Sequence, residues 1–228
     1  MTRCGIELRR MGSGANSVEE IAQKIADFFY QSLRMGPDDR ACALVRFYVT
    51  ASYSELQPDL QEFADNIVGK HGSPGMKCLT LLGTAGEESA WNSRKQSVGH
   101  KAIPLQSEES IAKSPMINAL IHQLGIPVPS LLENDQRIML DEHQHSFNVF
   151  HVERAEGSPY IPAQKDFVIP HQVKSVLGLG GMLPTGEMFA IVLFSKLGIP
   201  RERAELFNTL ALNAKLAILP FAGKQLFA

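Results

Sequence analysis

The sequence has little of what defines a secreted or membrane-bound protein. Only three of its 228 residues are cysteine, and Cys4, Cys42 and Cys78 are too widely spaced for a disulfide framework or a CxxC metal knuckle. The longest uncharged apolar run, Met188 to Phe194, is far too short to span a bilayer. The N-terminus has no apolar signal-peptide core. We therefore expect a soluble, cytoplasmic protein that does not act on a membrane.

An excess of one charge and the common catalytic motifs are also missing. The 22 Lys and Arg residues nearly balance the 24 Asp and Glu residues, which gives a formal charge of -2 without long blocks of either sign. This balance argues against a nucleic-acid partner. The sequence contains no GxSxG, HExxH, GxGxxG or GK[ST] motif. We therefore expect no enzymatic activity and assign no catalytic residue.

Helical and strand periodicities alternate along the rest of the chain. Apolar residues at helical spacing predict helices near 17–33, 54–69, 115–124 and 200–220. Short β-branched or aromatic runs predict strands near 41–51, 77–86, 146–155 and 175–195. No repeat or linker divides the chain. We expect one domain over 17–221, preceded by a flexible leader, 1–16, and followed by a short tail, 222–228.

Three glycines, Gly178, Gly180 and Gly181, lie between two apolar runs and raise the question of a phosphate site. A phosphate-binding turn ends a strand and opens a helix. Here the sequence LPTGE, 183–187, instead marks a turn, and a second β-prone run follows it. We therefore predict a hairpin, with the glycines allowing a bulge or the close approach of another element. Because its second strand lacks polar alternation, that strand should be central in the sheet.

The segment from 167 to 221 resembles the end of GAF domains, the small-molecule sensing fold found in bacterial sensor histidine kinases. The matching positions are Gly178, Gly181, Gly186, Phe189 and Leu193. The resemblance implies an α+β fold, in which an antiparallel sheet of about five to six strands lies between a bundle of N- and C-terminal helices and a layer of ligand-enclosing helices and loops. It also implies a sensory or regulatory module that signals through its terminal helices, with a histidine kinase or another signalling chain as a partner.

In this fold the ligand pocket lies between the sheet and the segment that joins the second and third predicted strands. Trp91 could stack on a planar ligand, and Arg94 and His100 could hold an anionic or amide group. The alternative is that Trp91 anchors a loop on the core and that Arg94 and His100 are solvated loop residues without a function. The predicted ligand-binding residues are Trp91, Asn92, Arg94, His100, Ser107 and Met116. The ligand itself stays open among a nucleotide, haem, an amino acid and an aromatic acid, and no cofactor is assigned.

Two alternatives place chemistry on other side chains. Four histidines are candidate metal or haem ligands: His143, His145, His151 and His171. No carboxylate or thiol completes a familiar metal-binding spacing with them, so we predict no metal site. Cys78 could serve a GAF-fold redox enzyme. Its place in a predicted strand, like that of Cys42, instead favours a role as a small core residue.

The apolar faces of the first and last predicted helices suggest a homodimer. Ile21, Ile25 and Phe28 could pair with Phe207, Leu210 and Ala214 of a second copy in a bundle across a two-fold axis. The remaining alternative is a module that binds no ligand and serves only protein interaction or dimerisation.

Overall fold

A six-stranded antiparallel sheet forms the centre of the computed structural model, which describes residues 2–132 and 148–228. Its strand order is β3-β2-β1-β6-β5-β4, and every neighbouring pair is antiparallel. The strands are β1 (Cys42–Ser52), β2 (Lys77–Gly86), β3 (Ala102–Leu105), β4 (Val149–Val152), β5 (Ser175–Met182) and β6 (Met188–Ser195). The expected α+β class is confirmed, and β6 is central as predicted.

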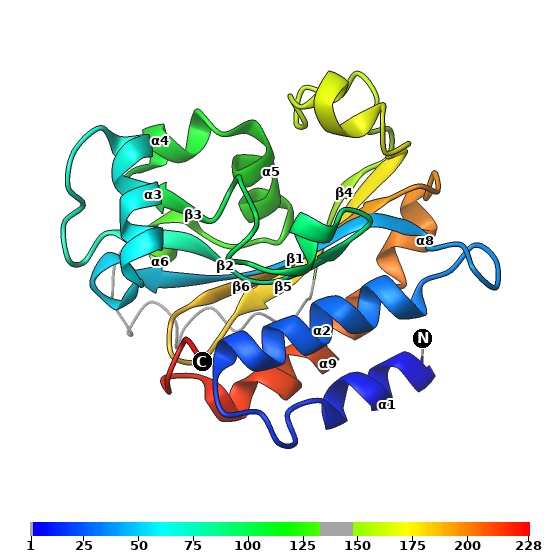
Figure 1. The fold of residues 1–228 in the computed structure, drawn as a ribbon, viewed down its shortest axis with the longest axis horizontal. Coiled ribbons are helices and arrows are strands. Elements are labelled where there is room, and N and C mark those ends of the chain that lie inside the picture. Colours follow the sequence, from blue (N-terminus) through cyan, green and yellow to red (C-terminus); the bar gives the residue numbers. More distant parts are fainter. Residues whose placement is uncertain (1, 133–147) are drawn as a thin grey trace.

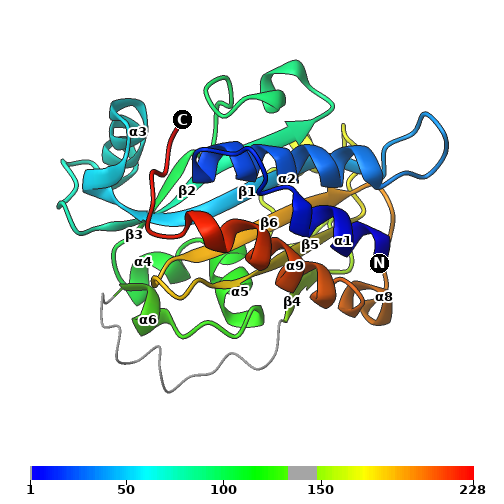
Figure 2. The same ribbon diagram turned by 90° about the horizontal axis from the view of Figure 1, so that it is seen from below.

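Helices cover both faces of this sheet (Figure 1). One face carries α1 (Thr2–Arg10), α2 (Val18–Ser32) and α9 (Asn208–Ile218), which lie side by side in Figure 2. Around the other face and the β3 edge lie α3 (Pro58–Val68), α4 (Glu108–Ala112), α5 (Pro115–Gln123) and α6 (Val128–Leu132). Helix α8 (Arg201–Glu205) contacts β4 at the opposite edge. Of the helices in 2–132 and 148–228, none is long and apolar enough to cross a membrane.

Strand alternation divides the interior into two apolar clusters. In β1, Val45, Phe47 and Val49 belong to the cluster under α2 and α9, whereas Leu44 and Tyr48 belong to the cluster on the other face. Successive side chains of a strand point to opposite faces, so a buried central strand must be apolar on both sides. Arg46 occupies the one charged position of β1, on the face of Leu44 and Tyr48.

The glycines of β5 allow a helix to approach the sheet closely. A Cβ atom at Gly178 would lie 2.7 Å from the Leu120 side chain of α5, and one at Gly180 would lie 3.0 Å from Leu124. Gly181 pairs with Phe189 of β6, within the strand. The predicted hairpin and close approach are therefore confirmed, and these glycines open no helix.

Both ends of the chain differ from the expected flexible leader and tail. Residues 2–10 form α1, which packs against α9 and buries Leu8 completely. In the tail, Phe227 is buried and the Leu226 carbonyl accepts a hydrogen bond from the Glu19 amide. Tertiary packing of a few apolar residues orders both segments, although neither carries a strong local pattern.

Two further expectations differ from the structure. Edge strand β3 was not predicted, because it is short and contains Pro104, and proline argues against a strand. An edge strand can contain a proline, since one of its sides has no partner strand. The side chains expected to pair helices across a dimer axis are already used within the chain. Ile21, Ile25, Leu210 and Ala214 are all buried against the chain's own sheet and helices. These four residues are therefore not available to a second copy, whereas Phe28 and Phe207 are half-buried, and the homodimer itself stays a prediction.

Candidate ligand-binding cavity

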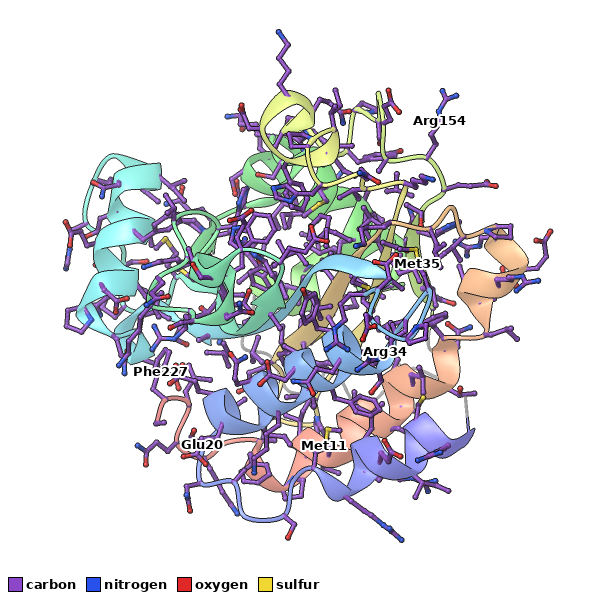
Figure 3. All side chains as sticks on the ribbon, turned by 45° about the vertical axis from the view of Figure 1, so that its right-hand side comes forward. Met11, Glu20, Arg34, Met35, Arg154 and Phe227 are labelled. Carbon is purple, nitrogen blue, oxygen red and sulfur yellow. The ribbon has the colours of Figure 1, made fainter. Side chains whose placement is uncertain are left out.

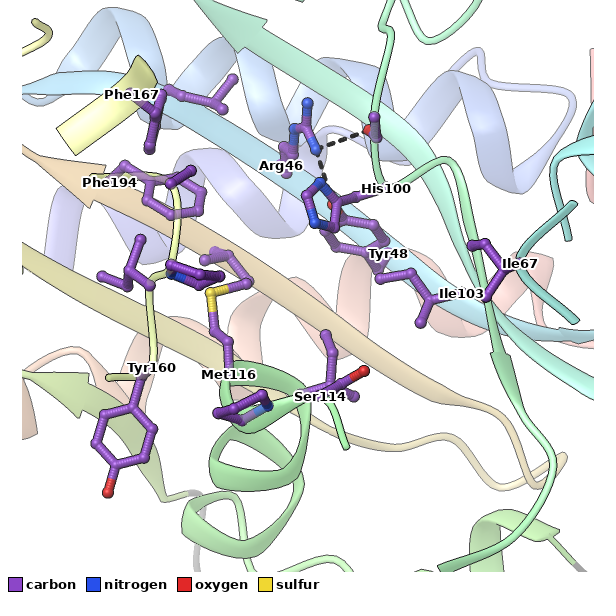
Figure 4. Close-up of a pocket in the computed structure, with 18 of the residues that line it drawn as sticks. Arg46, Tyr48, Ile67, His100, Ile103, Ser114, Met116, Tyr160, Phe167 and Phe194 are labelled. Carbon is purple, nitrogen blue, oxygen red and sulfur yellow. Dashed lines mark hydrogen bonds between the residues drawn. The ribbon is translucent and has the colours of Figure 1, made fainter. Parts of the chain in front are cut away.

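A cavity of about 640 Å³ opens on the face of the sheet opposite α2 and α9 (Figure 4). Strands β1 and β6 form its floor, and parts of α3, α5, the 99–103 segment and the 160–167 segment surround it. The lining residues that carry the description below are Arg46, Tyr48, Trp91, His100, Met116, Phe167 and Phe194. Pockets for small organic ligands have volumes in this range.

Aromatic rings form one wall of the cavity. Phe194 comes from β6, Trp91 from a short turn after β2, and Phe167 from a single π-helical turn at Gln164–Val168. The centroid of Phe167 lies 5.6 Å from that of Trp91 and 5.0 Å from that of Phe194, and both pairs are edge-to-face. The Trp91 ring also contacts His171, at 4.6 Å between centroids. Such a wall favours a flat, apolar ligand surface.

Arg46 supplies the buried charge of the cavity. It projects from the middle of β1 and is only 8% exposed. Its Nη1 donates to the Tyr48 hydroxyl, at 3.3 Å, and to the Gly99 carbonyl, at 3.1 Å, as Figure 4 shows. Its Nη2 donates to Ser97 Oγ, at 3.0 Å. Its Nε has no hydrogen-bond partner, and no carboxylate of the described residues forms an ion pair with it.

His100 lies next to Arg46 and has an unusual backbone conformation. Its φ is +59°, in the left-handed region that few residues other than glycine adopt. Its side chain stays open to solvent at the cavity, yet desolvation by the surrounding protein and, second, the charge of Arg46 lower the pKa of the imidazole. The lowered pKa keeps this ring neutral at pH 7. His100 can therefore donate or accept a hydrogen bond in the cavity but adds no charge.

The six predicted site residues divide into two groups. Trp91, His100 and Met116 line the cavity. Asn92 and Ser107 do not, because each is engaged in local structure. The Asn92 side chain accepts from the Gly86 amide at 2.9 Å, and Ser107 caps α4 by accepting from the Ser110 amide at 3.2 Å.

Arg94 also lies outside the cavity lining and has a structural setting. Its Nε is 2.7 Å from a Glu19 carboxylate oxygen of α2, and its Nη2 donates to Gln57 Oε1 at 2.8 Å, directly before α3. The residue is 3% exposed, and its guanidinium lies 5.1 Å from the Phe227 ring centre. Figure 3 shows Phe227 near the start of α2. Arg94 therefore joins the loop after β2 to α2, α3 and the C-terminal segment.

Arg46, Tyr48, Phe167 and Phe194 were not predicted as site residues. For Arg46 a signal was present, because it is the one charged residue in the otherwise apolar run 41–51. A charge in a strand buried on both faces needs a partner, a metal or a ligand. No comparable signal marks Phe167 or Phe194, since core residues and cavity walls have the same composition.

The side chains of the two alternative sites lie elsewhere or have other partners. Cys42 and Cys78 belong to the apolar cluster on the far face of the sheet, and burial raises the pKa of each thiol to about 12. His151 Nε2 lies 2.7 Å from the Ile199 carbonyl oxygen, and His171 lies 3.3 Å from Glu87. His143 and His145, which were also considered as metal ligands, lie outside the described residues. Within 2–132 and 148–228 no group of three His, Cys, Asp or Glu residues could hold a metal.

These features are those of a GAF-like α+β fold with a cavity on one face of its sheet. Among solved structures, the chain is similar to the free methionine-R-sulfoxide reductase from Neisseria meningitidis in complex with its substrate, with 10% identity and a TM-score of 0.52 over 97% of this chain and 87% of that chain. This likeness shows the fold alone. No protein-family model and no curated protein sequence matches the chain.

Two GAF domains of phosphoenolpyruvate-protein phosphotransferases are also similar, each with 12% identity over 97% of this chain. The domain from Acinetobacter has a TM-score of 0.45 over 94% of its own length. The domain from Coxiella burnetii has a TM-score of 0.48 over 95%.

Proposed function

We propose that the protein is a regulatory module that binds a small molecule in the cavity above β1 and β6. The cavity is the observation that carries this proposal, because it combines a volume of about 640 Å³ with aromatic walls and a buried arginine. Sites of this kind, apolar with a few placed polar groups, are typical of small-molecule binding. The alternative of a redox enzyme that uses a cysteine is disfavoured, because the described lining residues include no cysteine.

The segment between β2 and β3 gives ligand binding a physical route to the terminal helices. Ser97 and Gly99 accept hydrogen bonds from Arg46 at the cavity. A few residues earlier, Arg94 pairs with Glu19 at the start of α2. A ligand that moves this segment therefore acts on contacts of α2 and of the C-terminal residues. In this proposal α2 and the C-terminal segment transmit the altered contacts to a signalling chain.

A thermal-shift screen tests the binding proposal. The panel contains nucleotides, haem, amino acids and aromatic acids, and a ligand present at 100 times its Kd should stabilise the folded state by about 2.7 kcal/mol. The matched control is Val192→Phe, because Val192 lies on β6 in the cavity lining and a larger ring there fills the space. We expect stabilisation of the natural protein and none of this variant. Stabilisation of neither protein, or of both equally, would contradict a role for the cavity.

A further inference from the structure

The buried guanidinium of Arg46 is incompletely satisfied, and the pattern of its contacts points to a particular kind of ligand. Its three hydrogen bonds all go to neutral oxygens, those of Tyr48, Ser97 and Gly99. An arginine has five N-H donors, so about two remain, one of them the partnerless Nε. Because Arg46 lines the cavity, a carboxylate bound there can accept charge-assisted hydrogen bonds from its guanidinium.

The charge of the cavity fits an anion with a single charge. Arg46 is the buried cation among the described lining residues. Lys113 also lines the cavity, but its side chain is 75% exposed and pairs with Glu109 at 3.1 Å. The neutral His100 adds no charge. A phosphate ester carries a charge of about -1.5 to -2 and is usually held by several donors or cations. A carboxylate therefore matches this site better than a phosphate does.

The rest of the cavity fits an apolar, flat body. The Trp91, Phe167 and Phe194 rings stand on one side, and Met116 and Ile117 come from α5 on another. Packing of an aromatic ring against such side chains contributes burial and edge-to-face contacts together. Two features with different roles thus line one cavity: the charged Arg46 on β1 and an aromatic wall that reaches β6.

We propose that the cavity binds an aromatic monocarboxylate, whose carboxylate accepts hydrogen bonds from the Arg46 guanidinium and whose ring packs against Trp91, Phe167 and Phe194. This inference rests on the proposed function, because it names the class of ligand for the same cavity. It assigns to Arg46 the anion contact that the sequence suggested for Arg94.

Calorimetric titration of acids and their amides tests the proposal. The probes are benzoate, phenylacetate and 3-phenylpropionate, each compared with the neutral amide of the same shape. They are titrated into the natural protein, Arg46→Met, Arg46→Gln and the control Arg154→Met, which removes an exposed arginine that Figure 3 shows at the protein surface. Thermal melts of all four proteins establish that each is folded.

We expect at least one acid to bind the natural protein and Arg154→Met with equal affinity, and about ten- to a hundredfold more tightly than its amide. In Arg46→Met and Arg46→Gln that preference should disappear while the amide still binds. If acid and amide bind the natural protein equally, or if the preference survives in both Arg46 variants, the carboxylate inference is wrong although the cavity still binds a ligand. If neither the acids nor the amides bind, and the thermal-shift panel also gives no stabilisation, the proposed function fails as well.

Discussion

Arg46 and Arg94 are both almost completely buried, yet their surroundings differ in kind. Arg94 lies beside α2, within 2.7 Å of the Glu19 carboxylate, and also contacts Gln57 and the Phe227 ring. Arg46 lies on the cavity face of the sheet, donates only to neutral oxygens and has no ion-pair partner among the described residues. One charge is neutralised within the chain. The other is not.

The difference separates a structural arginine from a ligand-binding one. Burying a charge is costly unless it is paired, so a protein keeps an unpaired buried arginine only where something else stabilises it or uses it. The residue type is the same and the burial is similar at both positions. What distinguishes them is whether the protein itself supplies the counter-charge, and this distinction can be tested by substitution.

The largest effect on stability should come from Arg94→Met. It leaves Glu19, whose side chain is 17% exposed, without its main partner, and it breaks the link between α2, α3 and the C-terminal segment. We expect the free energy of unfolding to fall by about 2–4 kcal/mol, measured by urea denaturation. Glu19→Gln should account for much of the same loss, and the double variant should be less destabilised than the sum. A loss below about 0.5 kcal/mol would contradict a structural role.

The next effect compares the packed and hollow faces of one strand. Ile191 and Val192 are neighbours on β6, but Ile191 belongs to the cluster under the helices and Val192 lines the cavity. Ile191→Phe should destabilise the protein by about 1–3 kcal/mol, because a filled core has no room for the ring. Val192→Phe should change stability by less than about 1 kcal/mol while abolishing ligand binding. If Ile191→Phe and Val192→Phe destabilise the protein equally in the same denaturation assay, the cavity face of β6 has no more room for a ring than the face under the helices.

A smaller effect on stability is expected from Arg46→Met. The substitution removes three hydrogen bonds but also removes a buried charge that the chain does not neutralise. These contributions oppose each other, so the free energy of unfolding without ligand should change by about 1 kcal/mol or less. The same urea experiment as for Arg94→Met gives the comparison directly. If Arg46→Met proves as damaging as Arg94→Met, the two arginines do not differ as described.

The smallest effect concerns pH and His100. The folded protein lowers the pKa of this ring from 6.5, so the unfolded chain binds the proton more readily. The stability contributed by neutral His100 is therefore complete above pH 6.5 and is lost as the pH falls through the lower folded value. His100→Asn removes the titration and tolerates the left-handed backbone. Melting curves from about pH 8 to 5 should favour the variant increasingly on the acid side. Parallel curves for the two proteins would contradict this.

Much of the fold could be predicted because periodicity reports which faces are buried. The apolar runs at 41–51 and 77–86 correspond to β1 and β2, and the predicted hairpin corresponds to β5 and β6. Edge strand β3 and helix α1 could not be predicted in the same way. Tertiary contacts stabilise α1, which packs against α9 and buries Leu8. The local sequence pattern does not reveal such contacts.

The site was only partly predictable, for a reason that Arg94 and Arg46 illustrate. Trp91 and His100 lie in an aperiodic segment, where polar and aromatic residues suggest function, and both line the cavity. Arg94 lies in the same segment but turns to Glu19 instead. The direction of a loop side chain depends on packing that one sequence does not reveal. Arg46 was detectable in principle, because a charge within a buried strand conflicts with its surroundings.

The central claim is that an anion completes the environment of Arg46. The most direct measurement is a crystal structure of the protein with the tightest-binding of the three acids, benzoate, phenylacetate and 3-phenylpropionate. The account predicts a carboxylate oxygen within about 3 Å of a nitrogen of the Arg46 guanidinium, with the aromatic ring against Trp91 and Phe167. A carboxylate directed to solvent or to Lys113, with no contact to the Arg46 guanidinium, would contradict it.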